Sequence, residues 1–162
     1  MLVLILASVA QTRRFARILA DELRPPALVT VEGDLGTGKT TLVRELLRAR
    51  GVRGAVTSPS FTLAQSYHGR DGEELHHLDL YRLSRGTDVD LFAWDDYLGP
   101  RVLTFVEWPA AGVEALPPAD VRLELEHRTR RSRRARLRAA APFEAAVKRA
   151  ATAQRIALED VP

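Results

Sequence analysis

Apolar residues are spaced along this chain in three ways, of which two predict strands and one predicts helices. Apolar runs within residues 1–10, 27–31 and 101–107 predict buried strands,. Alternating apolar and polar residues predict two hairpins, formed by segments 61–67 with 75–81 and 121–126 with 134–139,. Helical spacing predicts helices from Ser8 to about Leu23, over 41–50, from Asp88 to about Leu98, and from Phe143 to about Leu158,.

A glycine-rich stretch from Gly33 to Thr40 reads G-x-x-x-x-G-K-T and lies between a predicted strand and a predicted helix,. In that setting, backbone N–H groups and the positive end of the helix point at a bound phosphate. Gly33, Gly36 and Gly38 allow the turn and the close approach of the backbone. Lys39 can reach the β- and γ-phosphates, and the Thr40 hydroxyl can ligate Mg²⁺. The stretch therefore predicts a nucleotide-phosphate site.

The order of elements around this loop predicts the fold class. Strand, loop, helix and further strands favour an α/β domain, a three-layer sandwich of the P-loop NTPase type. Its central sheet should be mostly parallel, with the hairpins added as antiparallel pairs. At 162 residues, with no internal repeat or long linker, the chain is most simply one domain over residues 1–162,.

Composition narrows the chemistry. Lys39 and Lys148 are the only lysines among 24 basic residues. A lysine at the P-loop position is informative in such a chain, because guanidinium does not replace a compact ammonium there. The chain has no cysteine, which excludes disulfides and thiolate metal sites,. It also has no asparagine, which excludes the N-K-x-D motif expected of a Ras-like GTPase.

Charge is unevenly distributed around a net value of +3. Residues 71–96 hold eight acids and two arginines, whereas residues 122–155 hold eleven basic residues and three acids. Such asymmetry is typical of partner-binding faces, but also of a well-solvated surface. The apolar N-terminal run lacks a preceding basic segment and is short, which favours a strand over a signal peptide. We therefore expect a cytoplasmic protein without a membrane partner.

Two carboxylates compete for roles at the phosphates. Glu107 ends an apolar strand, where P-loop proteins place an acid directed at Mg²⁺ opposite the Thr40 hydroxyl,. We assign Glu107 mainly to the metal, and Asp79 to the attacking water or to an outer contact with the metal. The reverse assignment stays open. Together with Lys39, these two acids form the predicted catalytic set.

Two other groups of polar residues have both a structural and a functional interpretation. The hydroxyl-rich segment 57–60 fits a switch that approaches a γ-phosphate, but equally a turn with local hydrogen bonds,. His76 and His77 face opposite sides of a strand, so they cannot both ligate one ion. We favour structural roles for both histidines.

Four segments together resemble the TsaE (YjeE) family, bacterial ATPases of threonylcarbamoyladenosine tRNA modification. They read GDLGTGKTTLVRELL at the P-loop, TSPSFTL at 57–63, HLDLYRL at 77–83 and VEW at 106–108. The resemblance implies ATP or ADP and Mg²⁺ as cofactors, with Thr40 and Glu107 at the metal and a functional role for Asp79. The nucleotide contacts that the motif and the resemblance imply are Gly33, Gly36, Thr37, Gly38, Lys39, Thr40, Thr41, Trp108 and Arg133, the last matched to the family's hairpin arginine.

The resemblance also implies a partner, the TsaD–TsaB heterodimer, whose turnover ATP hydrolysis supports. The predicted hairpin tip, residues 127–133, is strongly basic and could contact tRNA or an acidic partner surface, since phosphate recognition is mainly electrostatic,. Two alternatives remain: a small-molecule kinase that uses residues 128–138 as an arginine-rich lid, and a non-enzymatic nucleic-acid module. The second leaves Lys39, Thr40 and Glu107 unexplained.

Overall fold

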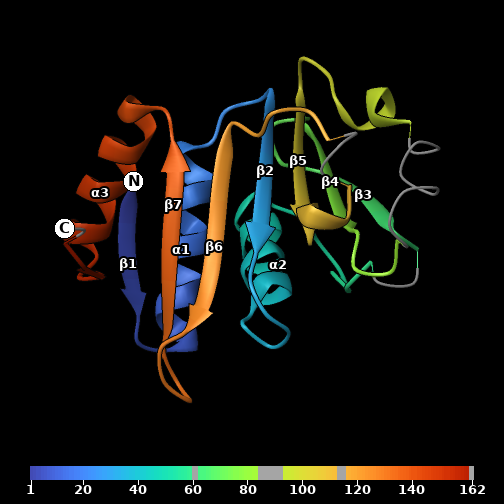
Figure 1. Ribbon diagram of the computed structural model, residues 1–162. Coiled ribbons are helices and arrows are strands. Elements are labelled where there is room, and N and C mark those ends of the chain that lie inside the picture. Colours follow the sequence, from blue (N-terminus) through green and yellow to red (C-terminus); the bar gives the residue numbers. More distant parts are fainter. Residues whose placement is uncertain (60–61, 84–92, 113–115, 161–162) are drawn as a thin grey trace.

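The computed structural model describes residues 1–59, 62–83, 93–112 and 116–160 (Figure 1). In this part of the chain, one eight-stranded sheet has the order β3-β4-β5-β2-β6-β7-β1-β8. The strands are β1 Leu2–Leu6, β2 Ala27–Glu32, β3 Ala64–His68, β4 Glu74–Asp79, β5 Val102–Glu107, β6 Val121–His127, β7 Arg133–Ala139 and β8 Ala157–Leu158. The helices are α1 Val9–Glu22, α2 Lys39–Ala49 and α3 Ala141–Ala153, with 3-10 turns η1 Trp94–Tyr97 and η2 Pro109–Gly112.

Four neighbouring strands, β4, β5, β2 and β6, are parallel and form the middle of the sheet. β3 pairs antiparallel with β4 at one side, and β7, β1 and β8 continue antiparallel at the other. Of the eight strands in the described residues, β1 and the middle four therefore run in one direction. The mostly parallel sheet and both antiparallel hairpins are confirmed. Parallel pairing also brings the carboxyl ends of β2, β4 and β5 together at the same end of the sheet.

The three α-helices of the described residues lie together on one face of the sheet, with α1 packed against both α2 and α3 (Figure 1). Between them and the sheet lies the main core, which includes the fully buried Phe15 and Phe105. The alternation of β6 and β7 explains this packing, because Leu123, Leu125 and Leu137 point into that core,.

The opposite face of the sheet is covered over only part of its width in the described residues. A smaller cluster that includes Leu78, Leu80 and Val106 lies there, packed against Trp94 and Tyr97 of η1. The predicted three-layer arrangement is therefore present where this cluster covers the sheet. In the described residues, its third layer consists of a 3-10 turn and loops rather than α-helices. Over β6 and β7, the outward positions are charged, and they form ion pairs such as Arg136 with Glu124 at 3.4 Å.

Some predicted boundaries are right. The expected N-cap starts α1: the Ser8 side chain accepts from the backbone N–H of Gln11 at 3.3 Å,. The reciprocal half of the capping box is shifted by one residue, because the Gln11 side chain accepts from the backbone N–H of Ala7, at 2.7 Å, rather than from that of Ser8. The hairpin predicted over 61–81 is also present, although residues 60–61 lie outside the described residues and β3 begins at Ala64.

The predicted last helix is too long. α3 ends at Ala153, because Arg155 adopts a positive φ of 57° and the Ile156 amide turns back to the Ala151 carbonyl at 2.9 Å,. Ile156 is buried in the main core, and β8 pairs with β1. Of the predicted helix from Asp88 to about Leu98, residues 88–92 lie outside the described residues and the described remainder is η1. No helix in the described part of the chain combines the length and apolar character needed to cross a membrane.

Candidate functional site

The P-loop connects the end of β2 to the start of α2, as its flanks predict. Gly33, Gly36 and Gly38 have positive φ values of 135°, 77° and 101°, which L-residues rarely adopt,. Gly33 is also packed tightly: a Cβ there would lie 2.1 Å from the carbonyl oxygen of Leu125. The start of the loop therefore rests directly on the backbone of β6.

Lys39 is buried in this structure, with only 4% of its surface exposed. Its Nζ donates to the carbonyl oxygens of Gly33 at 2.6 Å and Asp34 at 2.9 Å, and lies 3.7 Å from the centroid of the Trp108 ring. Burial lowers the pKa of Lys39, and the nearby acids, Glu107 foremost, partly oppose that shift,. The ammonium thus lies at the loop with two carbonyl oxygens as partners, which phosphate oxygens could replace.

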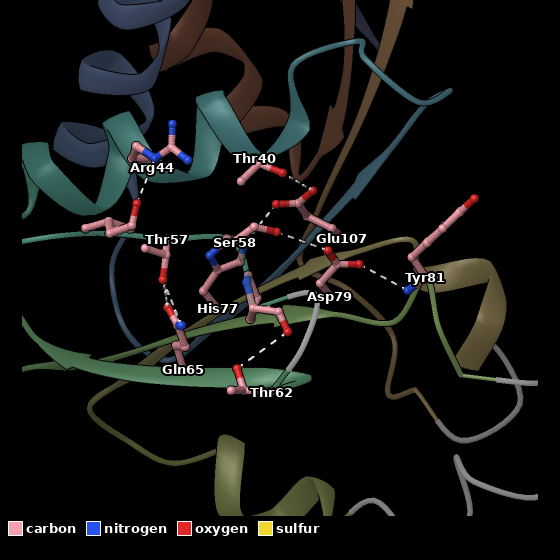
Figure 2. Close-up of polar contacts among 12 residues, drawn as sticks. Thr40, Arg44, Thr57, Ser58, Thr62, Gln65, His77, Asp79, Tyr81 and Glu107 are labelled. Carbon is pink, nitrogen blue, oxygen red and sulfur yellow. Dashed lines mark hydrogen bonds and ion pairs between the residues drawn. The ribbon is translucent and has the colours of Figure 1, made fainter.

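Glu107 is the centre of a buried polar group in Figure 2. One carboxylate oxygen, Oε2, accepts from the Thr40 hydroxyl at 2.8 Å, and the other, Oε1, lies 2.7 Å from Nε2 of His77. Glu107 is 1% exposed and His77 is completely buried. The predicted pairing of Glu107 with Thr40 is therefore present in the structure.

Asp79 lies directly beside Glu107, because the two residues are register partners in the parallel β4–β5 pair. Its Oδ2 accepts from the Ser58 hydroxyl at 3.4 Å, and its Oδ1 accepts from the Tyr81 amide at 3.1 Å (Figure 2). Asp79 is 4% exposed, so two buried carboxylates lie next to one another at the carboxyl ends of β4 and β5.

The hydroxyl-rich segment shows features of both of its interpretations. Thr62 and Leu63 donate backbone N–H groups to the carbonyl of Pro59, at 2.9 and 2.7 Å, and such local hydrogen bonds agree with the structural interpretation. Ser58 nevertheless faces Asp79, and α2 holds the segment through Arg44, which donates to the Val56 carbonyl at 2.8 Å (Figure 2). The segment is thus connected to both the P-loop helix and the acidic pair.

Arg133 approaches the P-loop from the start of β7. Its guanidinium donates to the carbonyl oxygens of Thr37 at 2.9 Å and Gly36 at 3.3 Å. Two cavities flank this loop. One, of about 610 Å³, includes Leu6, Val9, Gly38, Thr41, Leu125 and Arg133 in its lining. The other, of about 280 Å³, includes Leu35, Lys39, Thr40, Asp79, Glu107 and Trp108. The structure therefore brings every predicted site residue to the P-loop or to these two cavities.

Two neighbours of the site were not singled out as site residues by sequence reasoning. His77 contacts Glu107, and the half-exposed Tyr81 packs on Trp108 with ring centroids 4.8 Å apart. Both belong to the segment HLDLYRL at 77–83, so that signature contained the available signal. The side-chain contacts themselves required the register of β4 against β5.

The donor chemistry around Thr40 suits Mg²⁺. Hydroxyl and carboxylate oxygens from Thr40, Glu107 and Asp79 are hard ligands, and Mg²⁺ often takes few protein ligands and keeps several waters. The described residues contain no cluster of three or more His, Cys, Asp or Glu side chains that could hold a metal ion without other ligands. The residues present fit a magnesium ion shared with phosphate oxygens.

The sheet order, the strand–loop–helix unit and the glycine conformations define the class as a P-loop protein. The family model for TsaE, threonylcarbamoyl adenosine biosynthesis protein TsaE, matches residues 6–135. This chain belongs to the TsaE family.

Individual relatives agree with this assignment. The tRNA threonylcarbamoyladenosine biosynthesis protein TsaE of Streptomyces coelicolor is 44% identical over 116 residues, covering 70% of this chain and 78% of the relative. The TsaE protein of Aquifex aeolicus is 36% identical over 135 residues, covering 82% and 92%. Among solved structures, Bacillus subtilis YdiB superposes with a TM-score of 0.76 over 96% of this chain and 99% of that chain. At 22% identity, this likeness shows a shared fold.

Proposed function

We propose that this protein binds ATP together with Mg²⁺ at the P-loop and hydrolyses it, in support of threonylcarbamoyladenosine formation on tRNA. The observation that carries the proposal is the convergence of Lys39, Thr40 and Glu107 on one cavity beside the P-loop. The names of the relatives, which place them in tRNA threonylcarbamoyladenosine biosynthesis, support the choice of pathway.

Each residue at this cavity has a distinct task in the proposal. Lys39 exchanges its two carbonyl partners for β- and γ-phosphate oxygens, while Thr40 and Glu107 hold the metal. A Mg²⁺ ion held by Thr40 and Glu107 would supply positive charge that offsets the negative charge of the phosphates. Asp79 orients the attacking water, a task supported by its place next to Glu107 and by its contact with Ser58 of the hydroxyl-rich segment.

The nucleoside occupies the larger cavity on the other side of the P-loop. Leu6, Val9 and Leu125 give this cavity apolar walls that suit an adenine ring, and Gly38 and Thr41 connect it to the phosphate side,. Arg133 contributes indirectly, through the loop carbonyls that it binds. Trp108 covers the phosphate side, where it now contacts Lys39.

A partner, the TsaD–TsaB heterodimer, completes the proposal, with the protein acting in the cytoplasm. The exposed tip of the β6–β7 hairpin, with Arg128, Arg130 and Arg131, is the surface available for tRNA or an acidic partner surface,. Arg130 and Arg131 also line the larger cavity, whereas Arg128 is not among its lining residues. Reversing Arg128 to Glu therefore tests the tip with less effect on nucleotide binding. Unchanged tRNA modification by that variant would count against a tRNA contact at Arg128.

Phosphate release from ATP, with and without TsaD–TsaB, tests the proposal. We expect Mg²⁺-dependent release by the wild type, and a loss of about 100-fold or more in Asp79→Asn and Glu107→Gln, since each removes a charge that phosphoryl transfer uses. Glu74→Gln is the matched control, because Glu74 lies on β4 but its side chain is 55% exposed. Near-normal rates in both site variants would refute the mechanism. Transfer of phosphate to an added nucleoside, instead of its release, would indicate a kinase.

A further inference from the structure

His77 is a buried titratable residue to which the proposed mechanism gives no task. It lies on β4, two residues before Asp79, and is completely buried. Its Nε2 lies 2.7 Å from Oε1 of Glu107, whereas its Nδ1 has no hydrogen-bond partner among the described residues. The polar interaction that holds this ring in the described structure is therefore directed at one carboxylate oxygen.

We propose that His77 is a positioning residue that fixes the carboxylate of Glu107 for Mg²⁺. This inference rests on the proposed function, because it concerns the metal that accompanies the nucleotide. His77 acts through Glu107 and touches neither the phosphates nor the metal. Residues in this outer position commonly set the orientation of metal ligands, and their loss typically weakens metal binding by about 10- to 100-fold.

The geometry shows why Glu107 needs such support. A carboxylate at the end of a strand can rotate about its last torsion, which is broad. Here, one oxygen is held by His77, which leaves the other directed at the Thr40 hydroxyl at 2.8 Å. The hydroxyl oxygen of Thr40 and Oε2 of Glu107, the two oxygens proposed to hold the metal, thus lie side by side without a metal present.

A purely structural role for His77 is the competing interpretation, and the chain contains its own control. His76 is the next residue on the same strand and is only 5% exposed. It faces the other side of the sheet, where Nδ1 contacts the Ser66 hydroxyl at 2.8 Å and the ring packs edge-on against Tyr97. Replacing either histidine should disturb β4 to a similar degree, but only His77 contacts Glu107.

The experiment measures ADP affinity by calorimetry over a series of Mg²⁺ concentrations, so its readout is binding rather than turnover. In His77→Leu, we expect the Mg²⁺ concentration at half-effect to rise about 10- to 100-fold, with Mg²⁺-free ADP affinity within about twofold of the wild type. His77→Gln should recover most of the effect, because its amide can donate from nearly the position of Nε2. His76→Leu should leave the Mg²⁺ dependence unchanged.

The outcomes separate the two claims. Should wild-type protein bind no nucleotide, the proposed function fails and the positioning role fails with it. Should the wild type bind Mg²⁺ and ADP normally while His77→Leu keeps the same Mg²⁺ dependence, the positioning role alone is overturned. If His77→Leu does not fold, the Gln and Asn variants decide. Both carry an amide, but that of Asn is too short to reach Glu107, so equal Mg²⁺ dependence in the two would overturn the inference.

Discussion

Replacing Gly33 by alanine tests whether the P-loop is held against β6 as tightly as the structure shows. An added Cβ would lie 2.1 Å from the Leu125 carbonyl oxygen, where ordinary contact begins at 3.4 Å, so backbone must move by about 1.3 Å. Overpacking of this kind costs about 1–3 kcal/mol. The φ of 135° adds about 1–3 kcal/mol of backbone strain for an L-residue,. We expect Gly33→Ala to lose about 2–6 kcal/mol of unfolding free energy.

Gly54→Ala separates the two contributions. Gly54 has a φ of 91°, but a Cβ there would have no neighbour within 4 Å, so only the strain of about 1–3 kcal/mol applies,. Thermal and urea unfolding followed by circular dichroism would measure both variants. For a chain of this size, each kcal/mol lowers Tm by about 2–4 °C. A Gly33→Ala protein as stable as Gly54→Ala, within about 0.5 kcal/mol, would show that the contact with Leu125 is not tight.

Three further predictions concern pH and the core. Burial lowers the pKa of His76, although Glu74 opposes the shift and His68 adds to it. Below pH 6.5 the unfolded chain therefore binds more protons than the folded protein, and the free energy of unfolding should fall as the pH drops below 6.5,. His76→Leu should lack this part of the fall in urea titrations at pH 7.5 and 5.5. The pKa of Lys39 is also lowered in the folded protein, so the wild-type free energy of unfolding should rise as the pH approaches 10.5,. Lys39→Met should lack that rise, and urea titrations at pH 8 and 10 would measure it. Leu4 on β1 is completely buried, so Leu4→Ala should cost about 2–5 kcal/mol in urea unfolding, and a cost near zero would mean that β1 is not part of the core,.

The sequence predicted those features that local patterns determine. The G-x-x-x-x-G-K-T stretch specifies its own loop, and the alternation at 121–126 and 134–139 specifies the β6–β7 hairpin. Strand periodicity also predicted that His76 and His77 face opposite sides of the sheet. The structure confirms this, because His76 contacts Ser66 and His77 contacts Glu107.

Other features depend on long-range pairing. One carboxylate oxygen of Glu107 contacts Thr40 and the other contacts His77. The contact with His77 depends on the register of β4 against β5, which no local sequence pattern encodes. The end of the last helix was missed for a similar reason. Residues 154–158 keep helical spacing in the sequence, but Ile156 is more stable in the main core, and this placement leads the chain on to pair with β1,.

The contact between Arg133 and the P-loop has a consequence for the orientation of peptide planes. In a trans peptide, the C=O and the following N–H lie in one plane and point in opposite directions. Since Arg133 binds the carbonyl of Thr37, the N–H of Gly38 must point away from the guanidinium. The β6–β7 hairpin thus aims a backbone dipole in the P-loop without contacting an anion itself. A cation placed behind the loop in this way improves the donor geometry in front of it, and does so before any nucleotide has arrived.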